Sequence, residues 1–211
     1  MISNQGSKKR RLRTGKLNVE NSSKIILDLC GGTGSWSKPY ADAGYDVRVI
    51  TLPEIDVRLY EPPATVYGIL AAPPCKEFSK ANWRKNRHQR NYKEGMECVE
   101  ACLKIIWQVQ KNKAPLIFWA LENPEGYLYL FLGYPYYKFQ PWQFGEIGML
   151  AAKRTALWGY FNKPKPTVKN RPLQFVPYVK EKTNDKWYGA SSMKRAITPP
   201  GFAKAFFEAN R

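Results

Sequence analysis

Short apolar runs alternate with amphipathic segments along most of the chain. Five runs predict buried strands: Lys24–Leu29, Asp46–Leu52, Tyr67–Ala72, Leu116–Leu121 and Thr155–Tyr160. Apolar residues at helical spacing predict three helices: Ser35–Ala43, a long helix through Met96 and Val109, and Gly201–Ala209. Strands that are apolar throughout and alternate with helices predict an α/β fold, in which a mostly parallel sheet carries helices on both faces.

Three loops with candidate chemistry follow predicted strands, at the sheet edge where α/β proteins bind ligands. The first loop has Asp28 at a strand end, followed by Gly31, Gly32 and Gly34, which let the backbone turn tightly and approach a ligand. Such a turn occurs in dinucleotide, phosphate and S-adenosylmethionine sites and does not choose between them. The loop has no lysine in the phosphate-cradling position, which argues against a nucleoside triphosphatase.

The second loop presents Cys75 directly after Pro73 and Pro74, which fix the backbone at the end of a strand. Basic side chains nearby favour a thiolate, so Cys75 is a candidate nucleophile. The alternative is that Cys75 is a small buried apolar residue, like the other three cysteines.

The third loop contains Glu122 and Asn123 at the end of a buried strand. A carboxyl group so placed is costly unless it is paired or functional, and it can hold a proton near neutral pH. The alternative for Glu122 is an acidic cap on the segment that follows.

Charge indicates the class of partner. The chain carries 34 Lys and Arg against 17 Asp and Glu, a formal net charge of +17. Neutralising phosphates releases counterions, so this excess favours a nucleic-acid partner, although a solvated basic surface would also account for it. The charge gathers in residues 1–23, expected to form a disordered basic arm, in the segment 84–93, and in the stretch 161–186.

Other classes of protein are excluded by composition. Four cysteines without a CxxC pair exclude a disulfide scaffold and a zinc ribbon. The apolar runs are far shorter than a bilayer span, and we expect no signal peptide, so the expected setting is the cytoplasm.

Together the three loops resemble motifs of the cytosine-C5 DNA methyltransferases, in the same order. The segment 28–34 resembles the family's cofactor motif, Pro74-Cys75 with Phe78-Ser79 its Pro-Cys motif, and Glu122-Asn123 its Glu-Asn-Val motif. Arg154 matches a later arginine motif less fully, and the segment 195–203 resembles the closing segment of small phage-type members. The resemblance implies a Rossmann-like S-adenosylmethionine-dependent methyltransferase domain over residues 24–211, with a minimal target-recognition region at about 161–194.

The resemblance also implies the reaction and its residues. The Cys75 thiolate adds to C6 of a flipped cytosine in DNA while protonated Glu122 donates to N3, and Arg154 assists at the base or its phosphate. C5 then takes the methyl group of S-adenosylmethionine, which leaves S-adenosylhomocysteine, and no metal takes part. The implied cofactor-binding residues are Asp28, Cys30, Gly31, Gly32, Gly34, Asp56, Pro74 and Thr198. We expect the segment 84–93 to close over the base, and the enzyme to be a monomer without membrane contact, in a host cytoplasm if phage-encoded.

Three departures from the family pattern bear on these expectations. Thr51-Leu52-Pro53 stands where the family has an acidic ribose-binding residue, so Glu54 would have to substitute. Cys30 replaces the aromatic residue that stacks on adenine. About 35 residues separate Tyr160 from Arg195, so target specificity is expected to be short, relaxed or delegated to a partner.

Alternatives from other classes remain open. One is a catalytically weak or inactive relative that serves as a DNA-binding or anti-restriction module. Another is an RNA or nucleotide cytosine-C5 methyltransferase. An amino-methyltransferase is disfavoured, because Cys75 stands where its Pro-Pro loop would carry an aromatic residue.

Overall fold

The computed structural model describes residues 20–80, 86–112, 116–147, 151–172, 182–183, 186–187 and 196–211. The main sheet consists of β1 (Ile25–Leu29), β2 (Asp46–Ile50), β3 (Gly68–Ala71), β4 (Phe118–Pro124), β5 (Tyr137–Phe139) and β6 (Thr155–Tyr160). The α-helices are α2 (Lys38–Asp42), α3 (Tyr92–Gln110), α4 (Tyr129–Leu132) and α6 (Pro200–Ala209), and the 3-10 helices are η1 (Arg87–Gln89) and η2 (Pro141–Phe144). A second, antiparallel pair joins β7 (Lys182–Thr183) to β8 (Lys186–Trp187).

The strands of the main sheet lie in the order β2-β1-β3-β4-β6-β5. The first four are parallel neighbours, whereas β6 runs antiparallel to β4, and β5 runs antiparallel to β6. The predicted α/β fold with a mostly parallel sheet is confirmed. The strand predicted at 155–160 coincides with β6, but the edge strand β5 has only three residues and no apolar run to reveal it.

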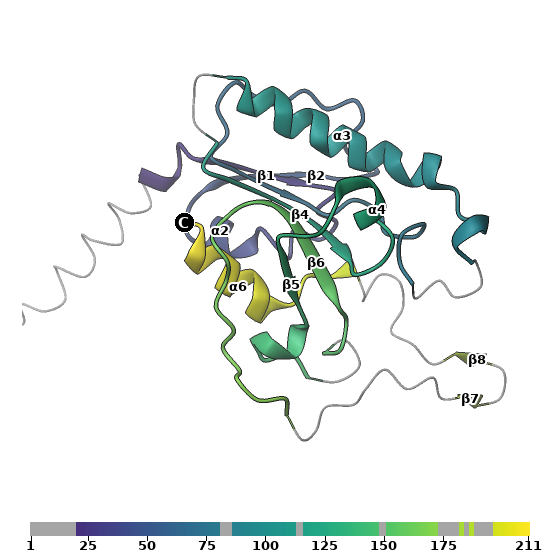
Figure 1. Ribbon diagram of the computed structural model, residues 1–211. Helices are drawn as coiled ribbons and strands as arrows, with labels where there is room; N and C mark the ends of the chain where they lie inside the picture. The colour runs from purple at the N-terminus through teal and green to yellow at the C-terminus, as the bar shows by residue number, and fades with distance from the viewer. Residues whose placement is uncertain are drawn as a thin grey trace, which may run out of the picture.

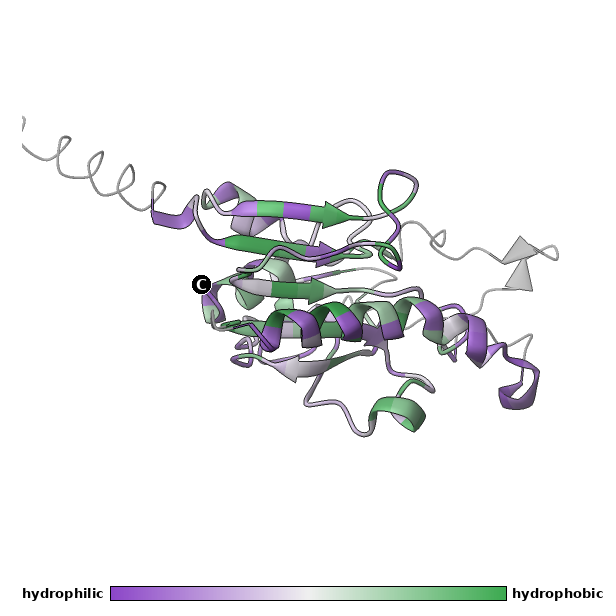
Figure 2. Cartoon of the chain, turned by 90° about the horizontal axis from the view of Figure 1, so that it is seen from above, coloured by the Kyte–Doolittle hydropathy of each residue, from purple (hydrophilic) through white to green (hydrophobic). Residues whose placement is uncertain are grey.

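Two apolar cores flank the sheet, because successive strand residues point to opposite faces. One core packs Leu27, Ile69 and Leu121 against α3, whose residues Val99 and Ile106 are buried. The other core packs strand residues such as Ile26 and Leu70 against α2 and α6. Figure 1 shows α3 on one side of the sheet and α2 and α6 on the other. In Figure 2 some strands are largely green and others carry purple or pale segments, and α3 alternates purple and green as expected of a helix with one apolar face.

The predicted long helix is confirmed as α3, whereas the predicted start of α2 and the predicted end of β4 are wrong for identifiable reasons. Helix α2 begins at Lys38 rather than Ser35, because residues 32–37 form turns around the glycine loop. Helix α3 begins at Tyr92, where the Asn91 side chain accepts a hydrogen bond from the backbone N–H of Glu94 and caps the helix. Strand β4 continues to Pro124, because β6 pairs with it along that extension.

Hydrogen bonds fix both sides of the segment 163–197. Asn162 and Asn210 exchange backbone and side-chain bonds, with the Asn162 N–H donating to Asn210 Oδ1 at 2.7 Å and Asn210 Nδ2 donating to the Asn162 carbonyl at 3.0 Å. On the other side, the Thr198 N–H donates to Ser35 Oγ at 2.9 Å. Residues 164–168 also contact the domain, because Tyr137 Oη donates to the Pro164 carbonyl and the N–H groups of Thr167 and Val168 donate to the Gln143 carbonyl.

The described part of the chain begins inside the proposed basic arm. Asn21 Nδ2 donates a hydrogen bond of 3.0 Å to the Ala43 carbonyl. The residues just before β1 therefore contact the domain at the end of α2. The arm's six lysines and arginines, all at or before position 16, lie outside the described residues.

Candidate active site

The loops after β3 and β4 meet at one edge of the sheet. The two strands are parallel neighbours with Ala71 opposite Leu121. Glu122 directly follows Leu121, and Cys75 lies four residues beyond Ala71, so the topology brings both to the carboxyl ends of adjacent strands. Glu122 was expected in a loop beyond the strand. It lies within β4 instead, opposite Leu157 of β6, which fixes its backbone more firmly than a loop would.

A single helical turn presents Cys75. The backbone N–H groups of Phe78 and Ser79 donate to the Cys75 carbonyl at 3.0 and 2.8 Å. Before the turn, Pro73 is buried, and its carbonyl accepts a hydrogen bond of 3.1 Å from Asn123 Nδ2. Asn123 therefore ties the Cys75 loop to the strand that carries Glu122. The two predicted catalytic residues therefore lie in segments that this hydrogen bond joins.

The cation beside Glu122 is Lys153. Its Nζ lies 3.4 Å from Glu122 Oε1, and the two side chains are 24% and 17% exposed. Arg154, the predicted catalytic arginine, is exposed, and its carbonyl accepts a hydrogen bond from the N–H of Glu125. Sequence reasoning missed Lys153, because nothing in two adjacent basic residues indicates which one faces the carboxylate.

The glycine turn encloses a buried carboxyl group. Asp28 is fully buried, and it accepts a hydrogen bond of 2.5 Å from Ser37 Oγ. Burial raises the pKa of Asp28 to about 6, against the lowering effect of the Ser37 bonds. A Cβ on Gly31 would lie only 2.6 Å from Asp28 Oδ1, so this position accepts glycine alone. Among the described residues, Oδ1 has no hydrogen-bond partner.

Cys30 follows β1 with a φ of 56°, a left-handed conformation that is uncommon outside glycine. The Cys102 thiol hydrogen-bonds to Cys30 and lowers the pKa of the Cys30 thiol. Cys98, one helical turn before Cys102 on α3, also contacts it. The glycine turn thus packs against thiols of α3, at the position where the resemblance expects an aromatic ring.

Asp56 is held by an arginine. Arg58 Nη2 lies 2.7 Å from Asp56 Oδ2, and Arg58 Nη1 lies 2.9 Å from Glu97 Oε2. This pairing holds the pKa of Asp56 below its ordinary value. A ligand amino group would have to share the carboxylate with Arg58.

The remaining predicted cofactor residues lie in the glycine turn, beside it, or in the Cys75 loop. Thr198 contacts Ser35, directly after the glycine turn. Gly32 and Gly34 have positive φ values of 55° and 69°, and a Cβ on Gly32 would meet open space. Pro74 is exposed beside Cys75.

The basic segment 84–93 divides into two kinds of residue. Arg87 and His88 are exposed, as a nucleic-acid surface requires, and Arg84 and Lys85 lie outside the described residues. Arg90 is 8% exposed and binds backbone carbonyls, so its assignment to the exposed basic surface is wrong. In the recognition region, Asn170 and Arg171 are exposed, whereas Gln174, Asn184 and Tyr188 lie outside the described residues.

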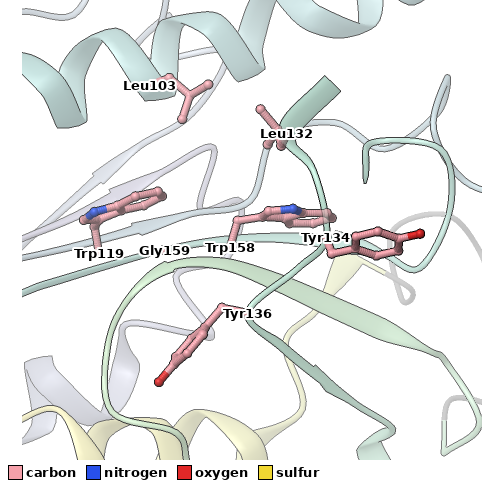
Figure 3. Close-up of a pocket in the computed structure, with 7 residues that line it drawn as sticks. All are labelled: Leu103, Trp119, Leu132, Tyr134, Tyr136, Trp158 and Gly159. Carbon is pink, nitrogen blue, oxygen red and sulfur yellow. The ribbon is translucent and has the colours of Figure 1, made fainter. Parts of the chain in front are cut away.

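A separate aromatic pocket lies on the α3 face of the sheet. It has a volume of about 310 Å³ and is lined by Leu103, Trp119, Leu132, Tyr134, Tyr136, Trp158 and Gly159. Figure 3 shows the indole rings of Trp119 and Trp158 beneath α3, with Tyr134 at the side and Tyr136 turned away. No predicted site residue lines it.

Within the described ranges, no cluster of three or more His, Cys, Asp or Glu side chains could hold a metal ion. None of the described helices is long and apolar enough to cross a membrane. No protein-family model matches the chain, and no curated protein matches it.

Proposed function

We propose that the protein is a cytosine-C5 methyltransferase that acts on DNA with S-adenosylmethionine as methyl donor. The observation that carries this proposal is the brace between the Cys75 loop and the end of β4. It puts a proline-mounted thiol and a partly buried glutamate at adjacent strand ends, with Lys153 beside the glutamate. A nucleophile and an acid in one rigid frame suit addition to a ring followed by proton transfer.

The residues around the glycine turn fit S-adenosylmethionine. A buried carboxyl oxygen of Asp28 lacks a partner among the described residues, and an ammonium group is a suitable donor for it. Gly32 leaves the backbone open where a ligand can approach, and Gly31 makes room for the Asp28 carboxyl group beneath it. Thr198 brings the closing segment to the same turn. The thiol of Cys30 gives a smaller apolar contact than an aromatic ring, so weaker adenine binding is expected.

When bound, S-adenosylmethionine supplies an electrophilic methyl group. The chain's residues make C5 of cytosine reactive enough to accept it. The Cys75 thiolate forms a bond to C6 of the flipped base, and the electron pair of the C5–C6 bond moves towards N3, where Glu122 donates its proton. After methyl transfer, a base removes the C5 proton, and the electron pair expels the Cys75 thiolate as Glu122 recovers its proton.

Lys153 takes the assisting role that the family resemblance assigns to Arg154. At 3.4 Å from Glu122, its ammonium group can orient the carboxyl group and stabilise the negative charge that Glu122 carries after it donates its proton. Exposed Arg154 is then available for a phosphate of the substrate. The net charge of +17 and exposed Arg87 favour a polynucleotide over a free nucleotide.

The test is methyl transfer followed by nucleoside mass spectrometry. The purified chain is incubated with isotope-labelled S-adenosylmethionine and, in separate arms, DNA, RNA or deoxycytidine triphosphate. Labelled 5-methyldeoxycytidine in the DNA arm is the expected result. Product only in another arm would reassign the substrate, and DNA binding without product in any arm would identify an inactive relative.

Two variants test the nucleophile. Cys75→Ala should abolish transfer, because it removes the thiol that adds to C6, while Cys98→Ala, a matched change of a half-buried thiol, should retain it. DNA containing 5-fluorocytosine should form an adduct with the wild-type chain that survives denaturing electrophoresis, since fluorine cannot leave as a proton does. Near wild-type turnover in Cys75→Ala would exclude the covalent mechanism.

A further inference from the structure

A single buried cation holds the turn that carries Cys75. Arg90 follows η1, and its residue is 8% exposed. Its Nη1 donates to the backbone carbonyls of Glu77 and Ser79, both at 3.0 Å. These carbonyls lie at the end of the helical turn whose first residue is Cys75. A guanidinium bound to both of them fixes the turn's orientation.

A second hydrogen bond, with the donor again on the segment of Arg90, joins this segment to the Cys75 turn. The Glu77 side chain is 3% exposed, and its Oε2 accepts a hydrogen bond of 2.9 Å from the Asn91 N–H. Burying charged groups is expensive unless their polar atoms are well engaged. A solvent-exposed arginine would supply positive charge without the cost of burial. The burial of Arg90 therefore indicates that it holds the turn in place.

Arg90 also reaches the segment that follows Glu122. Its guanidinium carbon lies 4.9 Å from the centre of the Tyr127 ring. The Tyr127 N–H donates to the Phe78 carbonyl at 2.8 Å, and a Cβ on Gly126 would overlap that same carbonyl oxygen. The chain after β4 is therefore pressed against the Cys75 turn, and Arg90 contacts both.

We propose that Arg90 is a positioning residue, which holds the Cys75 thiol at a fixed place relative to Glu122. The inference rests on the proposed function, because it assigns Arg90 a part in that reaction. Asn123 braces the loop before Cys75, and Arg90 braces the turn after it. Lysine cannot fully replace it, because an ammonium group has no flat face to lie over the Tyr127 ring and its donors are not held in one plane as those of a guanidinium are.

Arg90→Lys tests the proposal in the full chain. Misplacing a reacting group by about 1 Å can cost about 10²-fold in rate, so kcat should fall about 10- to 100-fold. KM for DNA and for S-adenosylmethionine should change by less than about two-fold, because Arg90 contacts neither ligand in this arrangement. The control Arg48→Lys alters an exposed arginine of β2 that pairs with Asp46, and it should leave kcat unchanged.

A second readout does not depend on methyl transfer. The rate at which iodoacetamide alkylates Cys75 is measured as a function of pH, by mass spectrometry of the peptide that contains Cys75. Arg90→Lys should shift this pH profile, because the thiol's surroundings change with the turn.

In Arg90→Ala, methylguanidinium should restore part of the lost rate of methyl transfer, whereas ammonium should not. If Arg90→Ala does not fold, Tyr127→Leu, which removes the stacking ring, should shift the profile in the same direction.

The outcomes separate the two proposals. A wild-type kcat and a wild-type alkylation profile in Arg90→Lys would overturn the role of Arg90 and leave the proposed function intact. A loss of activity that matches the unfolded fraction, without a shifted profile, would also overturn it. If the wild-type chain transfers no methyl group but Arg90→Lys still shifts the profile, the proposed function fails and the positioning of Cys75 by Arg90 stands.

Discussion

Replacing Asp28 by asparagine should change how the stability of the protein depends on pH. Burial raises the pKa of Asp28 from 3.8 to about 6 in the folded state. Each unit of pKa difference corresponds to 1.36 kcal/mol, so ionised Asp28 costs the folded state about 3 kcal/mol above pH 6. Asparagine carries no charge and avoids this cost.

The direction of the effect follows from proton binding. Below about pH 3.8 the carboxyl group is protonated in both states, and the cost is absent. Between about pH 3.8 and 6 the folded state holds a proton that the unfolded state has lost, so the free energy of unfolding falls as pH rises. Above about pH 6 both states are ionised, and the difference between wild type and Asp28→Asn becomes constant.

Urea unfolding of both proteins, followed by tryptophan fluorescence between pH 4.5 and 8, measures this difference. Other ionisable groups titrate alike in the two proteins and cancel. The free energy of unfolding of Asp28→Asn minus that of wild type should rise by roughly 2–3 kcal/mol across the window and then level off. A difference independent of pH would refute the assignment of a raised pKa to Asp28. Under the proposed function, S-adenosylmethionine should raise the melting temperature of the wild-type protein, and Asp28→Asn should lose this stabilisation.

Three further predictions concern the site, the core and the basic arm. Lys153→Gln should lower kcat for methyl transfer about 10-fold or more through its effect on Glu122. Arg154→Gln should instead raise KM for DNA with little change in kcat. Equal kcat values in the two variants would contradict the assignment of the assisting role to Lys153. Phe202→Ala removes a fully buried ring stacked 3.9 Å from Phe139 and should cost about 3–5 kcal/mol in denaturant unfolding, and a cost below about 1 kcal/mol would mean that the core is not packed as described. Deleting residues 1–20 should weaken DNA binding and reduce the salt slope by up to about 5, since the arm carries six basic residues, while bisulfite sequencing should show an unchanged methylation motif.

The central sheet could be predicted because its strands are apolar on both faces. Residues 68–71 are buried throughout, and β6 was predicted to the residue. The direction of β6 could not be predicted, since an apolar run gives no sign of whether it pairs parallel or antiparallel. The extent of β4 was missed for the same reason, because its end depends on pairing with β6.

The site was predictable where backbone chemistry limits the choice of residue. Proline before Cys75 and glycine at position 31 indicate loops that must hold one shape. Side-chain partners were not predictable, because a charged residue in a basic cluster gives no sign of burial. Arg90 was expected on the surface, and only the carbonyls of distant Glu77 and Ser79 explain why it is inside.

The paired anchors around segment 163–197 give this domain a means of acquiring new specificity. Asn162 is tied to Asn210, and Thr198 is tied to Ser35, so the sheet and α6 complete their packing on either side of the segment. Doubling the length of such a connection adds only about 0.6 kcal/mol of closure entropy. Insertions after Val168, whose N–H bonds to the Gln143 carbonyl, would therefore cost the fold little. Evolution, or an engineer, could lengthen the chain there while the sheet and α6 keep their packing.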